Sequence, residues 1–185
     1  MEPVARVGVT VTFLRMFTRP AAPPPPLAAG ASVVRLAVPT AAFYRYLYDT
    51  VGGPYVWWLR RAVSPAELAA IIRHPDVSIH VLYQDGEPAG FFELDARPSP
   101  AVNLSYFGLM PHAVGRGLGH AFLRAAVDAA WCARPRLVTV NTCTADHPRA
   151  LPLYCKVGFQ QFRQVRELWE VPLRLGMTIP SRLRA

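Results

Sequence analysis

Several patterns are scarce in this chain, and each scarcity excludes a class of protein. Cysteine is rare: Cys132, Cys143 and Cys155 are odd in number and not spaced for a metal, so we expect reduced thiols and no metal site. Apolar residues make up 52% of the sequence, yet no window approaches the uninterrupted length of a membrane span. A basic start followed by an apolar segment is also lacking. We therefore predict a cytoplasmic protein.

Acidic residues are outnumbered by basic ones, which leaves a formal net charge of +8 that is carried mostly by arginine. Such a surface can attract nucleic acid or acidic lipid. The arginines are nevertheless scattered, for example at 60–61, 134–136 and 163–166, with no stripe of basic and aromatic residues. We therefore predict that neither nucleic acid nor a membrane is the main partner. A positive field would also suit a polyanionic small molecule.

The chain of 185 residues is long enough for one domain, 1–185, with its own core. Alternating β-branched residues predict an N-terminal strand at 7–17. Prolines cluster in the connector at 19–30, which is typical of a stiff, polyproline-like spacer. The core is expected at 32–172, and the polar tail at 173–185 is expected to be loosely held.

Hydrophobic periodicity and turn residues predict the remaining elements. Strands are expected at 33–38, 77–84, 88–95, 102–110, 136–143 and 160–171. Helices are expected at 41–50, 65–73, 118–131 and 148–156. Ser64, Pro65 and Glu67 make a complete helix-start signature, and Asp85-Gly86 predicts a hairpin turn. This order of elements is typical of an α/β fold, here a mixed α+β sheet with helices on both faces.

The most informative segment is 114–119, Val-Gly-Arg-Gly-Leu-Gly, which lies between a predicted strand and a predicted helix. Its glycines let the backbone approach a ligand closely, and the first helical turn has free N–H groups. Together with the helix dipole they predict an anion site suited to a pyrophosphate. The ATP/GTP loop is excluded, because His120 and Ala121 follow Gly119 where Lys and Ser/Thr are needed. The dinucleotide fingerprint fails as well, because its third glycine is missing.

The segment resembles the pyrophosphate loop of the GNAT superfamily, the acyl-coenzyme A-dependent N-acyltransferases, whose pattern is Gln/Arg-x-x-Gly-x-Gly/Ala. Gly117 and Gly119 match its glycines, and Val114 stands in the place of Gln/Arg. Residues 147–159 are similar to a second family segment, Asn-x-x-Ala-x-x-Leu-Tyr-x-x-x-Gly-Phe, with His147 in place of Asn. The two motifs occur in the family's order with a predicted strand between them.

This resemblance implies a GNAT-like central sheet, mostly antiparallel and splayed, with helices around it. It also implies acetyl-CoA as co-substrate, no metal, and a binding strand edge before the glycine loop, where Gly108 would permit the bulge that splays the sheet. The residues that it implies for donor binding are Leu109, Met110, Val114, Gly115, Arg116, Gly117, Leu118, Gly119, His147 and Tyr154.

The activity that the resemblance implies is direct transfer of an acetyl group to a primary amine in a ternary complex. Tyr154 matches the family tyrosine near the thioester sulfur, where a phenol would return a proton to the leaving thiolate; the alternative is a packing role. Cys143 or Cys155 as a covalent nucleophile is a rival, but the sequence pairs neither with a histidine.

Glu93 is the leading candidate for the base that deprotonates the amine, because it lies on the strand beside the donor-binding strand among apolar neighbours. Many family members carry a carboxylate at the position of Asn103, which cannot act as a base. An ordered water is the alternative to Glu93. Asp95 and His112 are weaker candidates.

The acceptor is expected to be a small-molecule or peptide amine. Aromatic residues are dense before the first hairpin, and aromatic rings can hold a cationic amine. We predict Tyr55, Trp57, Trp58 and Tyr106 as the acceptor site. A homodimer is left open, and a non-catalytic GNAT-like module that senses acyl-CoA is the alternative function.

Overall fold

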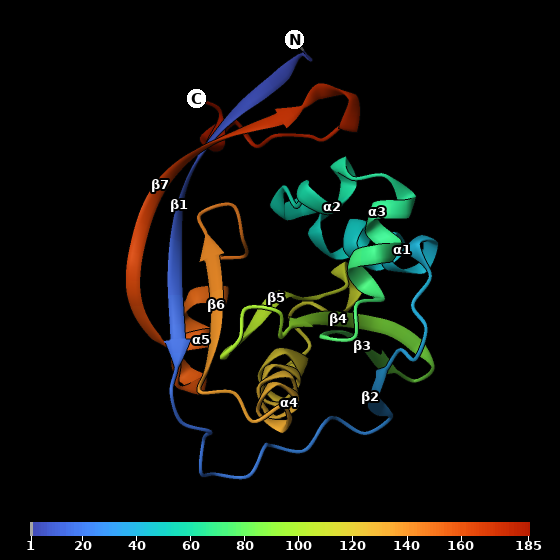
Figure 1. Ribbon diagram of the computed structural model, residues 1–185, viewed down its shortest axis with the longest axis vertical. Helices are drawn as coiled ribbons and strands as arrows, with labels where there is room; N and C mark the ends of the chain where they lie inside the picture. The colour runs from blue at the N-terminus through green and yellow to red at the C-terminus, as the bar shows by residue number, and fades with distance from the viewer. Residues whose placement is uncertain (1) are drawn as a thin grey trace.

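One seven-stranded sheet organises the chain in the computed structural model, which describes residues 2–185 (Figure 1). The strand order is β2–β3–β4–β5–β6–β1–β7. The strands span Val4–Met16 (β1), Ala31–Arg35 (β2), Val77–Gln84 (β3), Glu87–Asp95 (β4), Ala101–Leu109 (β5), Leu137–Cys143 (β6) and Gln160–Pro172 (β7). Every neighbouring pair is antiparallel except β5 and β6, which are parallel. The predicted mixed, mostly antiparallel sheet is confirmed.

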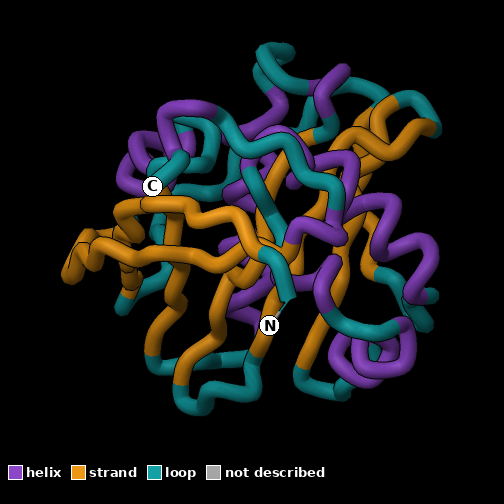
Figure 2. The backbone as a smooth tube through the Cα atoms, turned by 90° about the horizontal axis from the view of Figure 1, so that it is seen from above, coloured by secondary structure: helices purple, strands orange, loops and turns teal. Residues whose placement is uncertain are grey.

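Five α-helices within residues 2–185 flank this sheet. They span Ala41–Gly52 (α1), Leu59–Ala62 (α2), Pro65–Ile72 (α3), Leu118–Cys132 (α4) and Ala150–Val157 (α5). Two adjacent residues of β5 show that α1 and α4 cover opposite faces: Gly108 faces Val51 of α1, whereas Phe107 packs on Phe122 of α4. Helices accordingly lie on both sides of the strands in Figure 2.

The local start and turn signals form the structures that they predict. Thr40 caps α1 by accepting a hydrogen bond from the Phe43 N–H. Ser64 and Glu67 form a full capping box at the start of α3. Asp85 and Gly86 both adopt positive φ angles, 51° and 89°, as a two-residue hairpin turn of the right twist requires.

The C-terminal tail is packed rather than loosely held, which corrects the expectation from its polar composition. Ile179 and Leu183 are buried in a cluster with Val7, and the Ala185 N–H donates to the Arg6 carbonyl at 3.1 Å. Leu175 and Met177 pack against the same cluster. These apolar side chains hold the tail against β1, because each removes apolar surface from water.

The proline-rich connector carries the chain from β1 to β2 at the opposite edge of the sheet, and passes α4 on the way (Figure 1). Arg124 of α4 donates from Nη2 to the Ala22 carbonyl at 2.7 Å, and Arg19 pairs with Asp128 at 2.9 Å. The spacer is therefore also fastened to the helix that it crosses.

Strands β5 and β6 pair only at their beginnings and then diverge. The pairing runs from Ala101 opposite Leu137 to Leu104 opposite Val140. The bulge lies at Ser105, where the register between β4 and β5 shifts, and not at Gly108 as expected. Gly108 has another reason to lack a side chain, since a Cβ there would overlap Val51.

Candidate functional site

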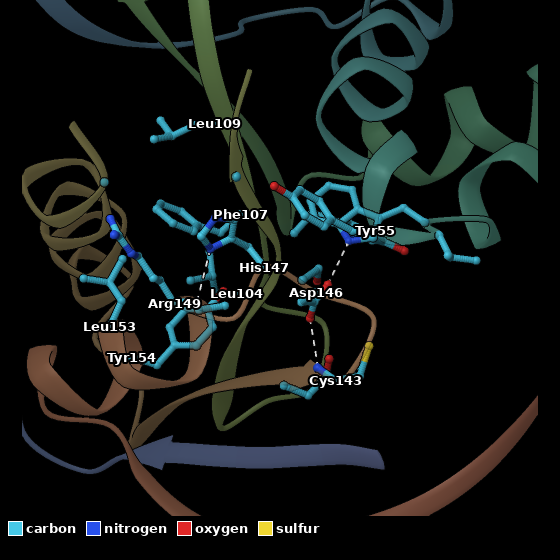
Figure 3. Close-up of a pocket in the computed structure, with 18 of the residues that line it drawn as sticks. Tyr55, Leu104, Phe107, Leu109, Cys143, Asp146, His147, Arg149, Leu153 and Tyr154 are labelled. Atoms are coloured by element: carbon cyan, nitrogen blue, oxygen red, sulfur yellow. Dashed lines mark hydrogen bonds between the residues drawn. The ribbon is translucent and has the colours of Figure 1, made fainter. Parts of the chain in front are cut away.

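The divergence of β5 and β6 opens a cavity of about 990 Å³ (Figure 3). Its walls come from β1, the segment 55–60, β5, the glycine loop, β6 with α5, and β7. We call the part beside the glycine loop and α5 the donor half. We call the part beside β1, β7 and the segment 55–60 the acceptor half.

The glycine loop, which the sequence predicts as the pyrophosphate site, lines the cavity with Gly115, Gly117 and Gly119. Gly115 and Gly117 have φ angles of 83° and 81°, and a Cβ on either would meet no protein atom within 4 Å. Gly117 is the N-cap of α4, and no side chain caps its first turn. The free N–H groups and the positive end of the helix dipole therefore lie open to an anion. His120 also lines the cavity, although the sequence did not single it out as a contact.

Of the two residues predicted at the strand edge before the loop, Leu109 lines the cavity and Met110 does not. The Met110 N–H donates to the Ala89 carbonyl at 2.9 Å, and its side chain is fully buried. Because residues of an antiparallel strand direct their backbone groups to alternate sides, Leu109 and Phe107 direct theirs away from β4, toward the cavity. Both line it.

The remaining predicted donor residues divide into two groups. Val114 lines the cavity, whereas Leu118 is buried in the core. Arg116 lies beside His112 on a second, smaller cavity of about 260 Å³ and does not line the first one.

Tyr154 stands on α5 at the wall of the cavity (Figure 3). Its ring packs edge-on against Phe107 and Phe159, with centroids 6.3 and 5.9 Å away. Burial, and to a smaller extent the charge of Asp146, raise the pKa of its phenol well above the usual range. The phenol therefore stays protonated at any pH in ordinary use, as a proton donor must.

His147 lies at the start of α5, where Nδ1 accepts a hydrogen bond from the Arg149 N–H at 3.1 Å. Its ring meets that of Tyr55 edge-on at 6.2 Å. Both His147 and Arg149 line the cavity. The Arg149 guanidinium adds a positive charge to the donor half that the sequence prediction missed.

All four predicted acceptor aromatics, Tyr55, Trp57, Trp58 and Tyr106, line the cavity. Trp57 and Tyr106 pack together with Tyr48 at centroid distances of 4.9 to 5.4 Å. These contacts fix the orientation of the aromatic wall.

Two carboxylates on this cavity were not predicted. Asp146 accepts from Trp57 Nε1 at 3.3 Å, from Thr142 Oγ1 at 2.7 Å and from the Cys143 N–H at 2.9 Å. Glu167 of β7 accepts from Trp169 Nε1 at 2.8 Å. Each comes from a segment far in sequence from the predicted aromatics, and only the pairing of β1 with β6 and β7 brings them to the same side.

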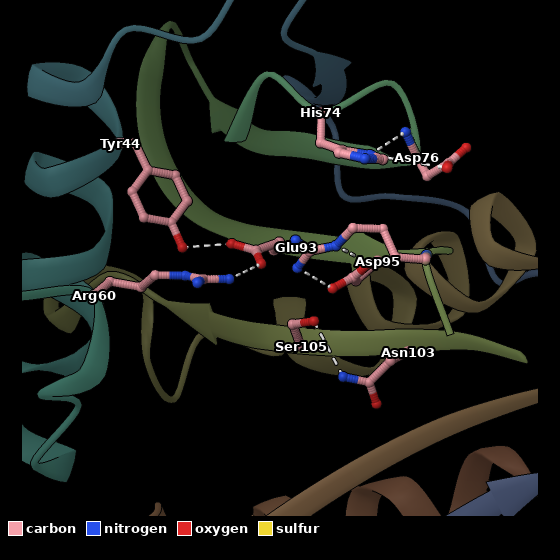
Figure 4. A network of polar contacts seen from close by, with 9 residues as sticks. Tyr44, Arg60, His74, Asp76, Glu93, Asp95, Asn103 and Ser105 are labelled. Carbon is pink, nitrogen blue, oxygen red and sulfur yellow. Dashed lines mark hydrogen bonds and ion pairs between the residues drawn. The ribbon is translucent and has the colours of Figure 1, made fainter. Parts of the chain in front are cut away.

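Glu93 does not line the cavity, and its carboxylate lies between Tyr44 and Arg60 (Figure 4). Its side chain is fully buried, its Oε2 accepts from the Tyr44 hydroxyl at 2.5 Å and its Oε1 pairs with Arg60 at 2.6 Å. Arg60, which lines the cavity, also lies over the Tyr106 ring at 5.4 Å. Because both carboxylate oxygens are occupied, this geometry favours a structural role for Glu93 over that of a base.

The other candidates for a base or a nucleophile differ in where they lie. Asp95 pairs with Arg97 at 2.6 Å, and this hydrogen bonding lowers the pKa of its carboxyl; it does not line the cavity. Cys143 does line it. Burial, and then the charge of Asp146, raise the pKa of this thiol to about 12, which argues against a thiolate nucleophile.

The model of the acetyltransferase (GNAT) family matches residues 42–159. The match covers more than half of the chain, which therefore belongs to this family. No curated protein matches the chain significantly. Within the described residues 2–185, no helix is long and apolar enough to cross a membrane, and no group of three or more His, Cys, Asp or Glu residues is placed to hold a metal ion.

Solved structures share the GNAT-like fold. A GCN5-related N-acetyltransferase from Sphaerobacter thermophilus has a TM-score of 0.65 at 15% identity, over 92% of this chain and 53% of that chain. A GCN5-related N-acetyltransferase from Kribbella flavida has a TM-score of 0.62 at 16% identity, over 91% of this chain and 60% of that chain. The aminoglycoside acetyltransferase meta-AAC0020 from an uncultured soil metagenomic sample, in complex with trehalose, has a TM-score of 0.61 at 13% identity. This match covers 77% of this chain and 96% of that chain. The chain spans 53% to 62% of the first four solved structures that it matches.

Proposed function

We propose that this GNAT-family acetyltransferase moves an acetyl group from acetyl-CoA to a cationic primary amine by direct transfer. One observation carries the proposal: a single cavity has an anion-binding glycine loop in its donor half and two carboxylates among aromatic rings, Asp146 and Glu167, in its acceptor half. The first suits a pyrophosphate, and the second suits an ammonium group. Membership in the family supports acetyl-CoA as the donor.

In this reaction the lone pair of the neutral amine attacks the thioester carbonyl carbon. The carbon–sulfur bond then breaks, and its electron pair stays on sulfur. The ammonium loses one proton to give the neutral amine, and its nitrogen loses a second one after the attack. Tyr154 supplies a proton to the thiolate, and the second proton of the nitrogen restores its phenol. Since both oxygens of Glu93 are occupied, we assign the proton of the ammonium to cavity water, and the base predicted at Glu93 is tested below.

The experiment measures free thiol as the protein is mixed with acetyl-CoA and a panel of amines: alkyl monoamines, diamines, amino acids, amino sugars and a peptide. We expect thiol release with at least one cationic amine, together with an acetylated product by mass spectrometry. Coenzyme A binding without thiol release for the whole panel would instead support the non-catalytic acyl-CoA module, which the departures at Asn103 and Val114 favour.

A further inference from the structure

A chain of three polar side chains lies where β5 and β6 separate. On β6, Thr139 donates from Oγ1 to Asn103 Oδ1 at 2.9 Å. Asn103 Nδ2 in turn donates to Ser105 Oγ at 3.1 Å (Figure 4). Asn103 and Ser105 both line the cavity. The amide of Asn103 is therefore held at both ends, one residue before the last paired position of the two strands.

The direction of these bonds determines where the hydrogen of Ser105 can point. A serine hydroxyl has one hydrogen to donate and two lone pairs. Because Ser105 Oγ receives the amide hydrogen of Asn103, its own hydrogen remains for another acceptor. No protein group within residues 2–185 takes it up. A group bound in the cavity is the natural acceptor, because a half-buried donor without a partner is unfavourable.

The bulge explains why this hydroxyl lies between the two halves of the cavity. Ser105 is the extra residue at the register shift of β5, and such a residue is left out of the ladder. Phe107 contacts α4 and Tyr154 on the donor side. Tyr106 contacts Tyr48 and Trp57 on the acceptor side. Ser105 directly precedes Tyr106 and Phe107, whose side chains point to the acceptor side and the donor side, respectively.

We propose that Ser105 donates a hydrogen bond to the carbonyl oxygen of the acyl group as that oxygen gains negative charge during transfer. Asn103 and Thr139 are positioning residues, which keep the Ser105 hydrogen directed into the cavity. The hydrogen stays on Ser105 throughout, so this contact involves no proton transfer. The inference rests on the proposed function, and it assigns Asn103 a role other than that of the base that many family members place there.

The first arm of the test removes the hydroxyl. Loss of one such donor lowers turnover by about 100-fold in acyl transfer, so we expect Ser105→Ala to lower kcat by about 100-fold while the KM for acetyl-CoA stays within about twofold. Ser105→Thr keeps a hydroxyl and should recover most of the lost turnover. Coenzyme A affinity by calorimetry shows that each variant retains its fold and donor site.

The second arm reverses the direction of the hydrogen bond. In Asn103→Asp the carboxylate only accepts, so both Thr139 and Ser105 donate to it and the Ser105 hydrogen leaves the cavity. We expect kcat to fall as far as in Ser105→Ala, with no further fall in the double variant.

Three results would overturn the proposal. If Asn103→Asp raises turnover, a carboxylate at this position acts as a base. If it leaves turnover unchanged while Ser105→Ala is impaired, the amide has the opposite orientation and Asn103 positions nothing. If Ser105→Ala keeps the wild-type kcat, the hydroxyl does not touch the reacting oxygen. A wild-type protein that releases no thiol with any amine would instead refute the proposed function itself, which keeps the two failures apart.

Discussion

The two halves of the cavity are built by different means. The donor half uses backbone: the edge of β5, a loop with two glycines at positive φ and the uncapped start of α4, all within residues 104–120. The acceptor half uses side chains from segments distant in sequence, among them Trp58, Asp146 and Glu167. A site built from backbone in one stretch of the chain depends on a few glycines at fixed spacing and tolerates changes at the other positions. Its glycine spacing can therefore be recognised in the sequence. A side-chain site assembled by the sheet leaves only local clues, such as the aromatic residues 55–58, and no sign of carboxylates such as Asp146 and Glu167.

The largest effect, on coenzyme A affinity, is expected at Gly119, where we expect room for a methyl group and for no larger side chain. Gly119→Val should weaken coenzyme A binding by about 100-fold, because a branched side chain would displace the pyrophosphate from the first-turn N–H groups. A Cβ at Gly119 is itself tolerated, 3.7 Å from Leu153, so the fold should survive. Gly119→Ala, which the family pattern allows, is the matched control and should retain most of the affinity. Calorimetric titration that finds equal affinities would remove the loop from the donor site.

Tyr154 comes next, as the donor-half residue to which the proposed reaction assigns a proton transfer. Tyr154→Phe should lower kcat by about 100-fold, as expected for loss of a general acid, with the KM for acetyl-CoA unchanged. Tyr46→Phe, on the exposed face of α1, is the control. Because burial raises the pKa of the Tyr154 phenol, its acid form persists, and wild-type turnover should show no decline up to pH ~10. Turnover of Tyr154→Phe at the wild-type level would reduce Tyr154 to packing.

A smaller effect is expected from a single charge in the acceptor half. Glu167→Gln keeps an acceptor for Trp169 and removes the charge. It should raise the KM for a cationic amine by about fivefold, the worth of one partly exposed ion pair, and leave unchanged the KM for an aromatic amine that is neutral at pH 7. Glu170→Gln on the same strand does not line the cavity and serves as the control. Equal KM changes for both amines would argue against charge recognition.

The smallest effect on turnover is expected at Glu93, although its effect on stability is large. Removing the charge leaves Arg60, whose side chain is 15% exposed, without its partner, so Glu93→Gln should lose about 3 kcal/mol in the free energy of unfolding. Its kcat and pH profile should match the wild type. If turnover falls at neutral pH and recovers as the pH rises, Glu93 is the base after all. Denaturant titration and kcat against pH measure the two quantities.

The sequence predicted the local structure well because its signals are local. The capping box at Ser64, the turn at Asp85-Gly86 and the glycine loop each depend on neighbours within a few residues. The tail was mispredicted, because its composition is mostly polar, whereas a few apolar side chains pack it onto a cluster with β1: Leu175, Met177, Ile179 and Leu183. The position of β1 between β6 and β7 leaves no trace in its own alternating pattern.

The prediction of Glu93 shows the same limit at the level of the site. Its place on β4 beside the donor strand was right, and so was its apolar setting. Its two oxygens are occupied by Tyr44 of α1 and by Arg60 of the four-residue helix α2. No sequence pattern could show this. Partners of a buried carboxylate are set by tertiary packing.

The place of β1 has a consequence for the order in which the protein can form. Its partners across the sheet, Cys143 and Val165 opposite Val11, belong to the last third of the chain. Contacts so distant in sequence are slow to form. At ordinary rates of synthesis, β1 would wait on the order of ten seconds before β7 leaves the ribosome. Until then, the edge of the thirteen-residue β1 that pairs with β7 has no partner.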